Sequence, residues 1–233
     1  RLSGVDGEFF KPPKLIQIGF NKTGSTYMAR IFYKQILGLT VLEGSLSARA
    51  KYFTGYISFA NEEEYDLGKA ILLYKSVLKD YGMIPDVFID ESLTFRYYIL
   101  FDQERTIKRL SELFPETVFI TGSRPLESWI ESHWMQYVRS GGLLSINVFI
   151  ERMLEREDSE LSMANFFRLK KILRSSLGQS RSYVYELSEL NDVAELAKKI
   201  SSIAWLNDRN IDESIAKSKA KSVNAADCPT SIY

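Results

Sequence analysis

Short apolar or β-branched runs recur along the chain, and most of them precede a stretch in which apolar residues return every three or four positions. The first pattern is typical of buried strands and the second of helices with one face on a core. We predict strands at residues 15–19, 39–42, 87–90, 118–121 and 183–187. Helices are predicted at residues 25–37, 62–80, 103–114, 126–138, 146–156, 163–176 and 193–204. This alternation predicts an α/β protein with a parallel sheet flanked by helices.

The 233 residues contain no repeat or low-complexity linker that would divide the chain. We therefore predict a single domain over residues 1–233, with a core at residues 14–205. Residues 148–176 carry two helical patterns with no strand between them, which predicts a helical flap over one edge of the sheet. Residues 214–233 are polar and rich in Lys, Ser and Ala, so we expect a frayed tail.

The segment KLIQIGFNKTGSTYMARIF, residues 14–32, is an apolar run that ends at Gly19, followed by a small polar loop and a helical pattern. Such a loop directs backbone N–H groups and the positive end of a helix dipole at one place, which suits phosphate or sulfate. Its glycines, Gly19 and Gly24, have the spacing of a Walker A motif, but Ser25 stands where that motif has lysine. The only lysine in the loop is Lys22. A phosphorylated ligand other than ATP or GTP is therefore favoured.

A second anion site is indicated after the predicted strand 118–121. Arg124 follows this strand, and Ser132 lies eight residues later on the predicted helix. An arginine offers a planar fork to phosphate oxygens, and a serine two turns along the helix can donate to the same group. The loops that follow parallel strands meet at one edge of the sheet. The two sites together indicate a nucleotide with two separate phosphate groups.

Composition narrows the choice of partners. Thirty basic and thirty acidic residues give a net charge of zero, so no overall field favours nucleic acid or an anionic membrane. Cys228 is the only cysteine, which excludes an internal disulfide and leaves too few soft ligands for a structural zinc site. No apolar run approaches about 18 residues and no leader is visible, so we expect no membrane span and a cytoplasmic protein.

The loop and the Arg–Ser pair resemble the PAPS-dependent sulfotransferases, enzymes that use 3′-phosphoadenosine 5′-phosphosulfate. In that family the loop after the first strand contains Lys, a variable residue, Gly, and then Ser or Thr twice, and it binds the 5′-phosphosulfate. The matching residues here are Lys22, Thr23, Gly24, Ser25 and Thr26. The resemblance implies a P-loop-like sulfotransferase fold. It also implies that the lysine amine contacts both the sulfate and the oxygen that joins the sulfate to the phosphate.

The second motif of the family is an arginine followed eight residues later by a serine, often with Pro, Ser and Trp between them, and it binds the 3′-phosphate. The residues that resemble it are Arg124, Ser128, Trp129 and Ser132. Pro125 lies one position nearer the arginine than is usual, but the spacing from arginine to serine is kept. The resemblance therefore covers both phosphate sites.

The resemblance extends over roughly residues 14–205. Tyr185 and Glu186 resemble the end of the late strand that these enzymes have after their helical segment. At the C-terminus, where many cytosolic members have a Gly-rich basic loop over the 3′-phosphate and adenine, the chain offers Lys217, Lys219 and Lys221.

The resemblance implies transfer of a sulfuryl group from PAPS to a hydroxyl acceptor, with 3′-phosphoadenosine 5′-phosphate (PAP) as product and no metal. A base must accept the proton of the acceptor, and a carboxylate or a histidine can do this. Glu43, after the second strand, is the first candidate, and Asp90 and Glu91, after the third, are the second. His133 is the only histidine, and its place beside Ser132 and between two tryptophans favours a packed role.

The acceptor is left open between a carbohydrate, a lipid-linked glycan and a small metabolite. Residues 48–59 and 96–101 are rich in aromatic side chains, which are typical either of an acceptor pocket or of a buried cluster. Two other functions compete with sulfuryl transfer. One is a nucleotide or small-molecule kinase with an altered loop, and the other is a protein of the same fold that binds nucleotide without turnover.

Overall fold

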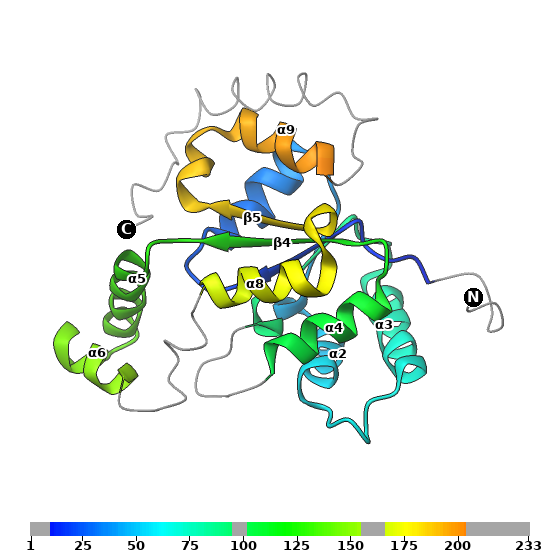
Figure 1. Ribbon diagram of the computed structural model, residues 1–233, viewed down its shortest axis with the longest axis horizontal. Helices are drawn as coiled ribbons and strands as arrows, with labels where there is room; N and C mark the ends of the chain where they lie inside the picture. Colours follow the sequence, from blue (N-terminus) through cyan, green and yellow to red (C-terminus); the bar gives the residue numbers. More distant parts are fainter. Residues whose placement is uncertain (1–9, 95–101, 155–165, 204–233) are drawn as a thin grey trace.

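A computed structural model describes residues 10–94, 102–154 and 166–203. Five parallel strands form one sheet in the order β2-β3-β1-β4-β5 (Figure 1). They are β1 (Leu15–Gly19), β2 (Val41–Glu43), β3 (Val87–Ile89), β4 (Val118–Ser123) and β5 (Ser182–Glu186). Every predicted strand is confirmed, and no strand end differs from its predicted position by more than two residues.

The central strand β1 sets the position of the loop that follows it. All five of its residues are buried, as expected for a strand covered on both faces of a parallel sheet. Leu15 lies opposite Val87 of β3 on one side and Val118 of β4 on the other. Because the three strands are parallel and in step, the segments that follow them meet at one edge of the sheet.

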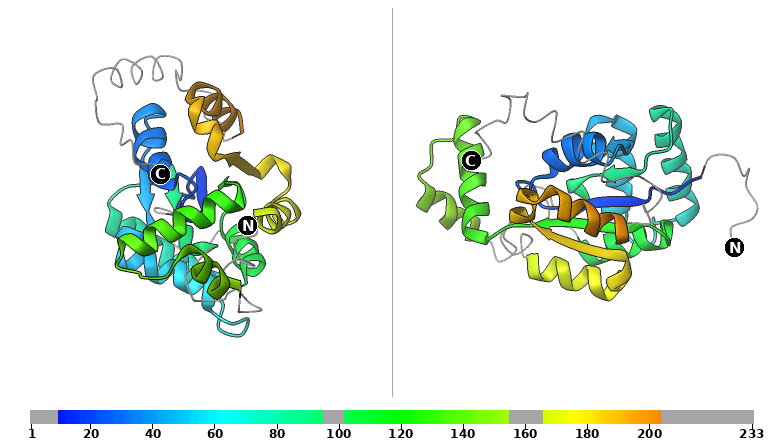
Figure 2. Two further views of the ribbon diagram at one scale, coloured as in Figure 1. Left: turned by 90° about the vertical axis from the view of Figure 1, so that its left-hand side faces the viewer. Right: turned by 90° about the horizontal axis from the view of Figure 1, so that it is seen from above.

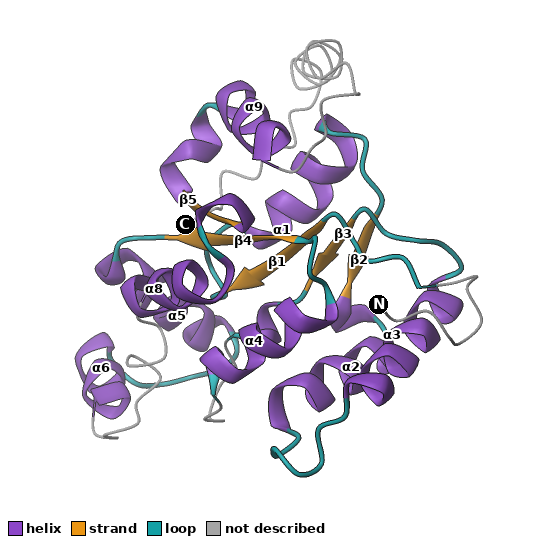
Figure 3. Ribbon diagram, turned by 45° about the vertical axis from the view of Figure 1, so that its right-hand side comes forward, coloured by secondary structure: helices purple, strands orange, loops and turns teal. Residues whose placement is uncertain are grey.

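Helices cover both faces of the sheet, which makes a three-layer α/β sandwich (Figures 1 and 3). One face packs α2 (Ala48–Phe59), α3 (Leu67–Tyr81), α4 (Gln103–Leu113) and α8 (Phe166–Leu177). The other face packs η1 (Met28–Ile36) and α9 (Val193–Ile203). Successive side chains of a strand point to opposite faces, so Leu15 joins the second layer while Ile16 joins the first.

The helix after the loop begins as α1 (Ser25–Tyr27) and continues as η1, which has π-type hydrogen bonds. At its end the Leu37 N–H donates to the carbonyl of Phe32, five residues back, at 2.9 Å. The predicted helix at residues 25–37 is confirmed in extent, whereas its wider winding has no signal in the apolar periodicity.

The helix α2 was not predicted from the sequence, because its aromatic residues fit a pocket lining as well as a helix face. Its buried positions include Ala50, Phe53, Thr54 and Ile57, the spacing of one helix face. Ser47 caps its first turn by accepting from the N–H of Ala50 at 3.3 Å. Segment 48–59 is thus a helix that packs on the sheet, and Phe53 lies in the core.

The prediction that a helix begins at residue 62 is wrong by five residues, since α3 begins at Leu67. Asp66 caps this helix by accepting from the N–H of Lys69 at 2.6 Å. The preceding residues form a turn in which the Glu64 N–H donates to Asn61 Oδ1 at 2.7 Å. Acidic residues at 62–64 therefore belong to a turn between α2 and α3.

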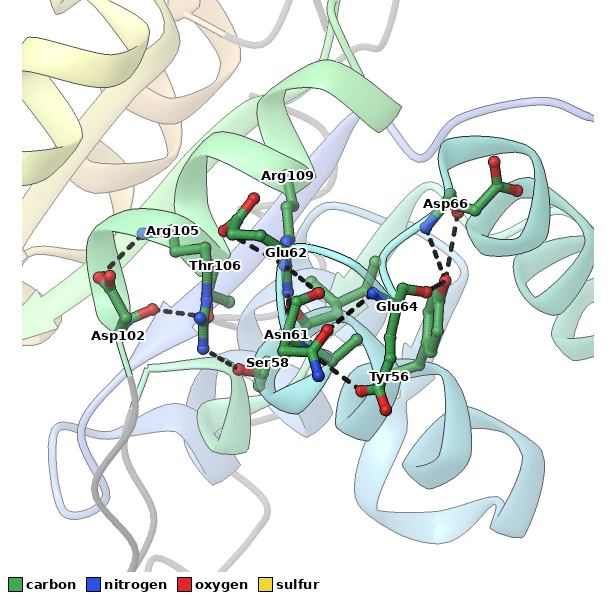
Figure 4. Close-up of polar contacts among 12 residues, drawn as sticks. Tyr56, Ser58, Asn61, Glu62, Glu64, Asp66, Asp102, Arg105, Thr106 and Arg109 are labelled. Atoms are coloured by element: carbon green, nitrogen blue, oxygen red, sulfur yellow. Dashed lines mark hydrogen bonds and ion pairs between the residues drawn. The ribbon is translucent and has the colours of Figure 1, made fainter.

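An arginine from α4 closes the C-terminal end of α2 (Figure 4). The Arg109 guanidinium donates to the carbonyls of Ile57 at 3.0 Å, Ala60 at 2.7 Å and Asn61 at 3.3 Å. It also lies over the ring of Tyr65, 4.1 Å from the ring centre. Arg109 thus satisfies carbonyls that the end of a helix leaves without a partner inside the helix.

The two helices predicted as a flap have different positions. α8 packs on α4 and the sheet, with Leu169 and Leu173 in the core. α6 (Ile146–Leu154) packs instead on α5 (Leu126–Arg139), and Tyr137 and Phe149 bring their rings to 5.3 Å. Figure 2 shows α5 and α6, in green, beyond one end of the sheet.

Single turns of 3₁₀ helix complete the described chain: η2 (Gly44–Leu46), η3 (Glu91–Leu93), η4 (Gln179–Arg181) and η5 (Leu187–Asn191). The predicted helices at 103–114, 126–138 and 193–204 are confirmed with ends shifted by one residue. The aromatic segment 96–101 and the tail 214–233, with its three lysines, lie outside the described residues.

Candidate active site

The loop between β1 and α1 lies at the edge of the sheet where β1, β3 and β4 end. Three of its carbonyls are held from within the loop or from the segment after β3. Thr94 donates to Gly19 at 3.0 Å, and Thr23 donates to Phe20 at 2.7 Å. The N–H of Met28 donates to the carbonyl of Gly24 at 2.9 Å, which starts the helix.

The other three carbonyls are held by side chains from α5, β5 and the segment between β4 and α5. Trp129 Nε1 donates to Asn21 at 2.8 Å, Arg124 Nη1 donates to Lys22 at 3.3 Å, and the Tyr185 hydroxyl donates to Thr23 at 3.1 Å. Every carbonyl from residue 19 to residue 24 therefore accepts a hydrogen bond from the protein. Because a trans peptide unit directs its N–H away from its C=O, each of these bonds also turns the N–H of the following residue away from the donor that holds the carbonyl.

Close packing fixes the shape of the loop. Gly24 has a positive φ of 86°, and a side chain there would meet Leu190 at 2.7 Å. Lys22 also has a positive φ, 67°, a conformation that is unfavourable for a residue with a side chain, by roughly 1–2 kcal/mol. The contacts on either side of Lys22 offset this cost, so the loop is held in one conformation by its surroundings.

Lys22 lies among other charged groups. Burial lowers the pKa of its amine, and the nearby Arg139 and Arg124 lower this pKa further, while Glu91 acts in the opposite direction. Arg139, at the end of α5, is a cation of this site that motif reasoning missed. The accumulation of positive charge favours an anion here, which would in turn stabilise the charged amine.

Glu91 begins the turn η3 after β3 and faces the loop. Its Oε1 atom is buried, and the Ser25 hydroxyl lies within hydrogen-bonding reach of its carboxylate. Burial raises the pKa of Glu91, helped by the charge of Asp90, although Ser25 and Lys22 favour the ionised form. A carboxylate with a raised pKa beside the loop has the properties of a proton acceptor.

The other two carboxylates named from the sequence have local partners. Glu43, at the end of the edge strand β2, pairs with Lys34 of η1 at 3.1 Å. Asp90 is 5% exposed and accepts from the N–H of Ser92 at 2.8 Å, which caps η3. Glu91 therefore lies beside the predicted loop, where Ser25 and Lys22 act on its pKa.

The predicted 3′-phosphate residues lie where β4 passes into α5. Arg124 follows β4 and donates from Nε to Ser128 Oγ at 3.0 Å. Ser128 and Ser132, four residues apart on α5, lie on the same side of the helix. The bond from Arg124 to the carbonyl of Lys22 joins the two predicted phosphate sites directly.

His133 lies on α5 beneath the loop and is 4% exposed. Its ring packs on Trp129, with centres 4.1 Å apart, and it is within hydrogen-bonding reach of the Asn21 backbone. Burial lowers its pKa to about 4, and the charge of Lys22 contributes to this shift. The imidazole is accordingly neutral near pH 7.

Within residues 10–94, 102–154 and 166–203, no group of three or more His, Cys, Asp or Glu side chains could hold a metal ion. Over the same ranges no helix combines the length and the apolar character that crossing a membrane demands.

Comparison with known proteins gives a structural likeness only. No protein-family model matches the sequence, and no curated protein does. A crystal structure of a sulfotransferase from Alicyclobacillus acidocaldarius superposes with a TM-score of 0.60 at 13% identity, over 84% of this chain and 81% of that one. The fold is sulfotransferase-like. An unliganded sugar kinase from Janibacter sp. HTCC2649 reaches a TM-score of 0.37 at 15% identity, over 84% and 95% of the two chains, which is too low to support an argument.

Proposed function

We propose that the protein is a PAPS-dependent sulfotransferase. The observation that carries this proposal is the loop whose six consecutive carbonyls are held by the protein, with Lys22 at its turn and Arg124 bonded to it. Such a loop suits an anion, and the adjoining arginine suits a second one. The sulfotransferase-like fold and the matching sequence of residues 22–26 support the same conclusion.

In this proposal the N–H groups of Gly24, Ser25 and Thr26 hold the 5′-phosphate of the donor, and Thr23 supports the loop from within. Arg124 and Ser132 hold the 3′-phosphate. PAPS supplies the sulfuryl group. Lys22 balances the charge that develops on the leaving phosphate, which is the main demand of such a transfer.

We infer that Glu91, rather than Glu43, is the base, because Ser25 and Lys22 of the loop act on the pKa of Glu91 whereas Glu43 is paired with Lys34. The acceptor oxygen forms a bond to sulfur, the bond from sulfur to the bridging oxygen breaks with its electron pair going to PAP, and the acceptor proton goes to Glu91. Asp90 and His133, both buried, are the remaining candidates.

The base is tested by comparing Glu91→Gln with Glu43→Gln. With any hydroxyl acceptor that supports PAP formation, we expect Glu91→Gln to lower turnover by about 100-fold or more, with little change in PAP affinity. Glu43→Gln is the matched control and should keep most of the turnover. Equal losses in the two variants, or a loss in Glu43→Gln alone, would reject this assignment.

The acceptor remains a hydroxyl compound, either a carbohydrate, a lipid-linked glycan or a small metabolite. We propose that the protein acts in the cytoplasm as a single domain, without a metal. The two competing functions are a kinase and a protein that binds nucleotide without turnover. The titration described next distinguishes both from a sulfotransferase.

The decisive experiment is a calorimetric titration with PAP, and separately with ATP with and without Mg²⁺. We expect PAP to bind without metal. Arg124→Ala should lower the affinity for PAP by about 10- to 100-fold and leave the affinity for adenosine 5′-phosphate unchanged. Arg49→Ala, an exposed arginine paired with Asp80 on α3, is the control and should bind like the wild type. Binding of Mg-ATP alone would make the protein a kinase, and binding of PAP without turnover across an acceptor panel would make it a binding protein.

A further inference from the structure

Trp129 is placed to act on the loop and not only on the core. It lies within α5 and is fully buried, with Phe20 and Phe166 near its ring at 6.5 and 6.4 Å. Although its ring is buried among apolar side chains, its indole N–H donates to the carbonyl of Asn21 at 2.8 Å. The carbonyl that it holds belongs to the residue immediately before Lys22.

The place of this bond matters because Lys22 is in the left-handed region with φ of 67°. Fixing the carbonyl of Asn21 fixes the peptide plane that joins Asn21 to Lys22, and this plane sets φ of Lys22. His133 packs on Trp129 and reaches the same backbone, so two neighbouring side chains of α5 act on one peptide unit. Arg124 holds the peptide that follows Lys22.

We propose that Trp129, supported by His133, is a positioning residue that holds Lys22 in its left-handed conformation and so directs its amine toward the donor. This inference rests on the proposed function for the identity of the donor. It assigns to α5 two tasks: Ser132 helps to bind the 3′-phosphate, and Trp129 sets the lysine that serves the 5′-phosphosulfate.

The same helix provides a matched control. Trp134 is partly buried, lies five residues after Trp129, and donates from its indole N–H to the carbonyl of Leu144 at 3.0 Å. The chemistry of this bond is the same, but its acceptor lies in the connection between α5 and α6. Trp129→Phe and Trp134→Phe thus remove equivalent donors from one helix, and only the first removes a donor to the loop.

The first measurement is the pH dependence of Lys22 acylation, read by mass spectrometry in the absence of nucleotide. In the wild type Lys22 should become reactive at lower pH than exposed lysines, as its buried and cationic surroundings require. Trp129→Phe should move this profile up toward that of exposed lysines, because a released loop lets the amine reach water. Trp134→Phe should leave the profile unchanged. Identical profiles for the two variants would overturn the positioning role.

The second measurement is PAP affinity in the same variants. We expect Trp129→Phe to weaken the binding of PAP and of adenosine 5′-phosphate equally, by about fivefold, the loss that one hydrogen bond commonly produces. Unchanged PAP affinity in a Trp129→Phe variant with a shifted acylation profile would also overturn the proposal. If Trp129→Phe does not fold, His133→Leu, which removes the other side chain at Asn21, replaces it with the same expectations.

The two measurements separate the inference from the proposed function. A wild type that does not bind PAP would reject the proposed function, and the acylation profile would still decide whether Trp129 positions Lys22. A wild type that binds PAP, with Trp129→Phe and Trp134→Phe alike in both measurements, would leave the proposed function standing and reject the inference.

Discussion

Arg109 and Arg124 both donate to backbone carbonyls, but in different surroundings. Arg109 is 3% exposed, and its guanidinium is shared among three carbonyls at the end of α2, the carboxylate of Glu62 and the ring of Tyr65. Arg124 is partly exposed and donates to one carbonyl and one serine within the described part of the chain. An arginine whose donors are taken up by the fold stabilises it, whereas one with donors to spare at a strand end suits a ligand.

Mutations that affect the C-terminal end of α2 should therefore lower the stability of the fold. Arg109→Ala leaves buried carbonyls without their donor, so we expect it to lower the free energy of unfolding by about 3 kcal/mol or more. Arg105→Ala is the control on the same helix, because Arg105 makes one long contact of this kind, 3.5 Å to Ser58, and it should cost less than about 1 kcal/mol. Chemical denaturation measures both. Similar losses of unfolding free energy in the two variants would show that the hydrogen bonds of Arg109 to the end of α2 do not stabilise the fold more than the contact of Arg105 does.

The stability around the loop between β1 and α1 should depend on pH through His133. Its pKa is lowered to about 4 in the folded protein, so the unfolded chain binds a proton at higher pH than the folded one. The resulting stability is present above about pH 6.5 and is lost as pH falls toward about 4, for a total of about 3 kcal/mol. The groups that face this ring with charge are Lys22 and Arg124.

The measurement is the unfolding free energy of wild type and His133→Asn from pH 7 to pH 4.5. We expect the difference between them to shrink steadily as the pH falls, because the asparagine does not titrate. Two curves that stay parallel over this range would show that His133 does not carry the acid sensitivity of the loop.

Glu91 should give a smaller effect of opposite sign. Its pKa is raised by burial, but Ser25 and Lys22 offset part of this shift. A raised carboxyl pKa stabilises the fold below the unfolded value of about 4.3, and this contribution is lost as pH rises through the folded value. Compared with Glu91→Gln, the wild type should thus lose relative stability on going from pH 4 to pH 7. Thermal unfolding across this range checks it, and a relative gain would mean that Lys22 dominates the environment of Glu91.

The sequence predicted the sheet and the positions of the loop after β1 and of α5, because short buried strands and loop motifs depend on neighbouring residues. It did not predict α2, since Phe53 and the aromatic residues around it fit a pocket as well as a helix face until the sheet is in place. The sequence alone also does not distinguish Glu43 from Glu91 as the proposed base. The distinction depends on Lys34 beside Glu43 and Ser25 beside Glu91, and these residues come together only in the folded chain. Trp129 belongs to the motif after β4, but its bond to Asn21 joins residues 108 positions apart in the sequence, so the motif does not predict it.

The smallest expected effect concerns the two serines beside Arg124. Ser128 accepts from Arg124, whereas Ser132 is proposed to contact the 3′-phosphate itself. Ser132→Ala should therefore lower the affinity for PAP by about fivefold, the loss of one hydrogen bond. The loss should be equal in an Arg124→Ala background. Ser128→Ala acts through the arginine, so it should have no further effect once Arg124 is alanine. Calorimetry of the three single variants and the two double variants gives both comparisons, and a Ser132 effect that vanishes with Arg124 would mean that both serines only orient the arginine.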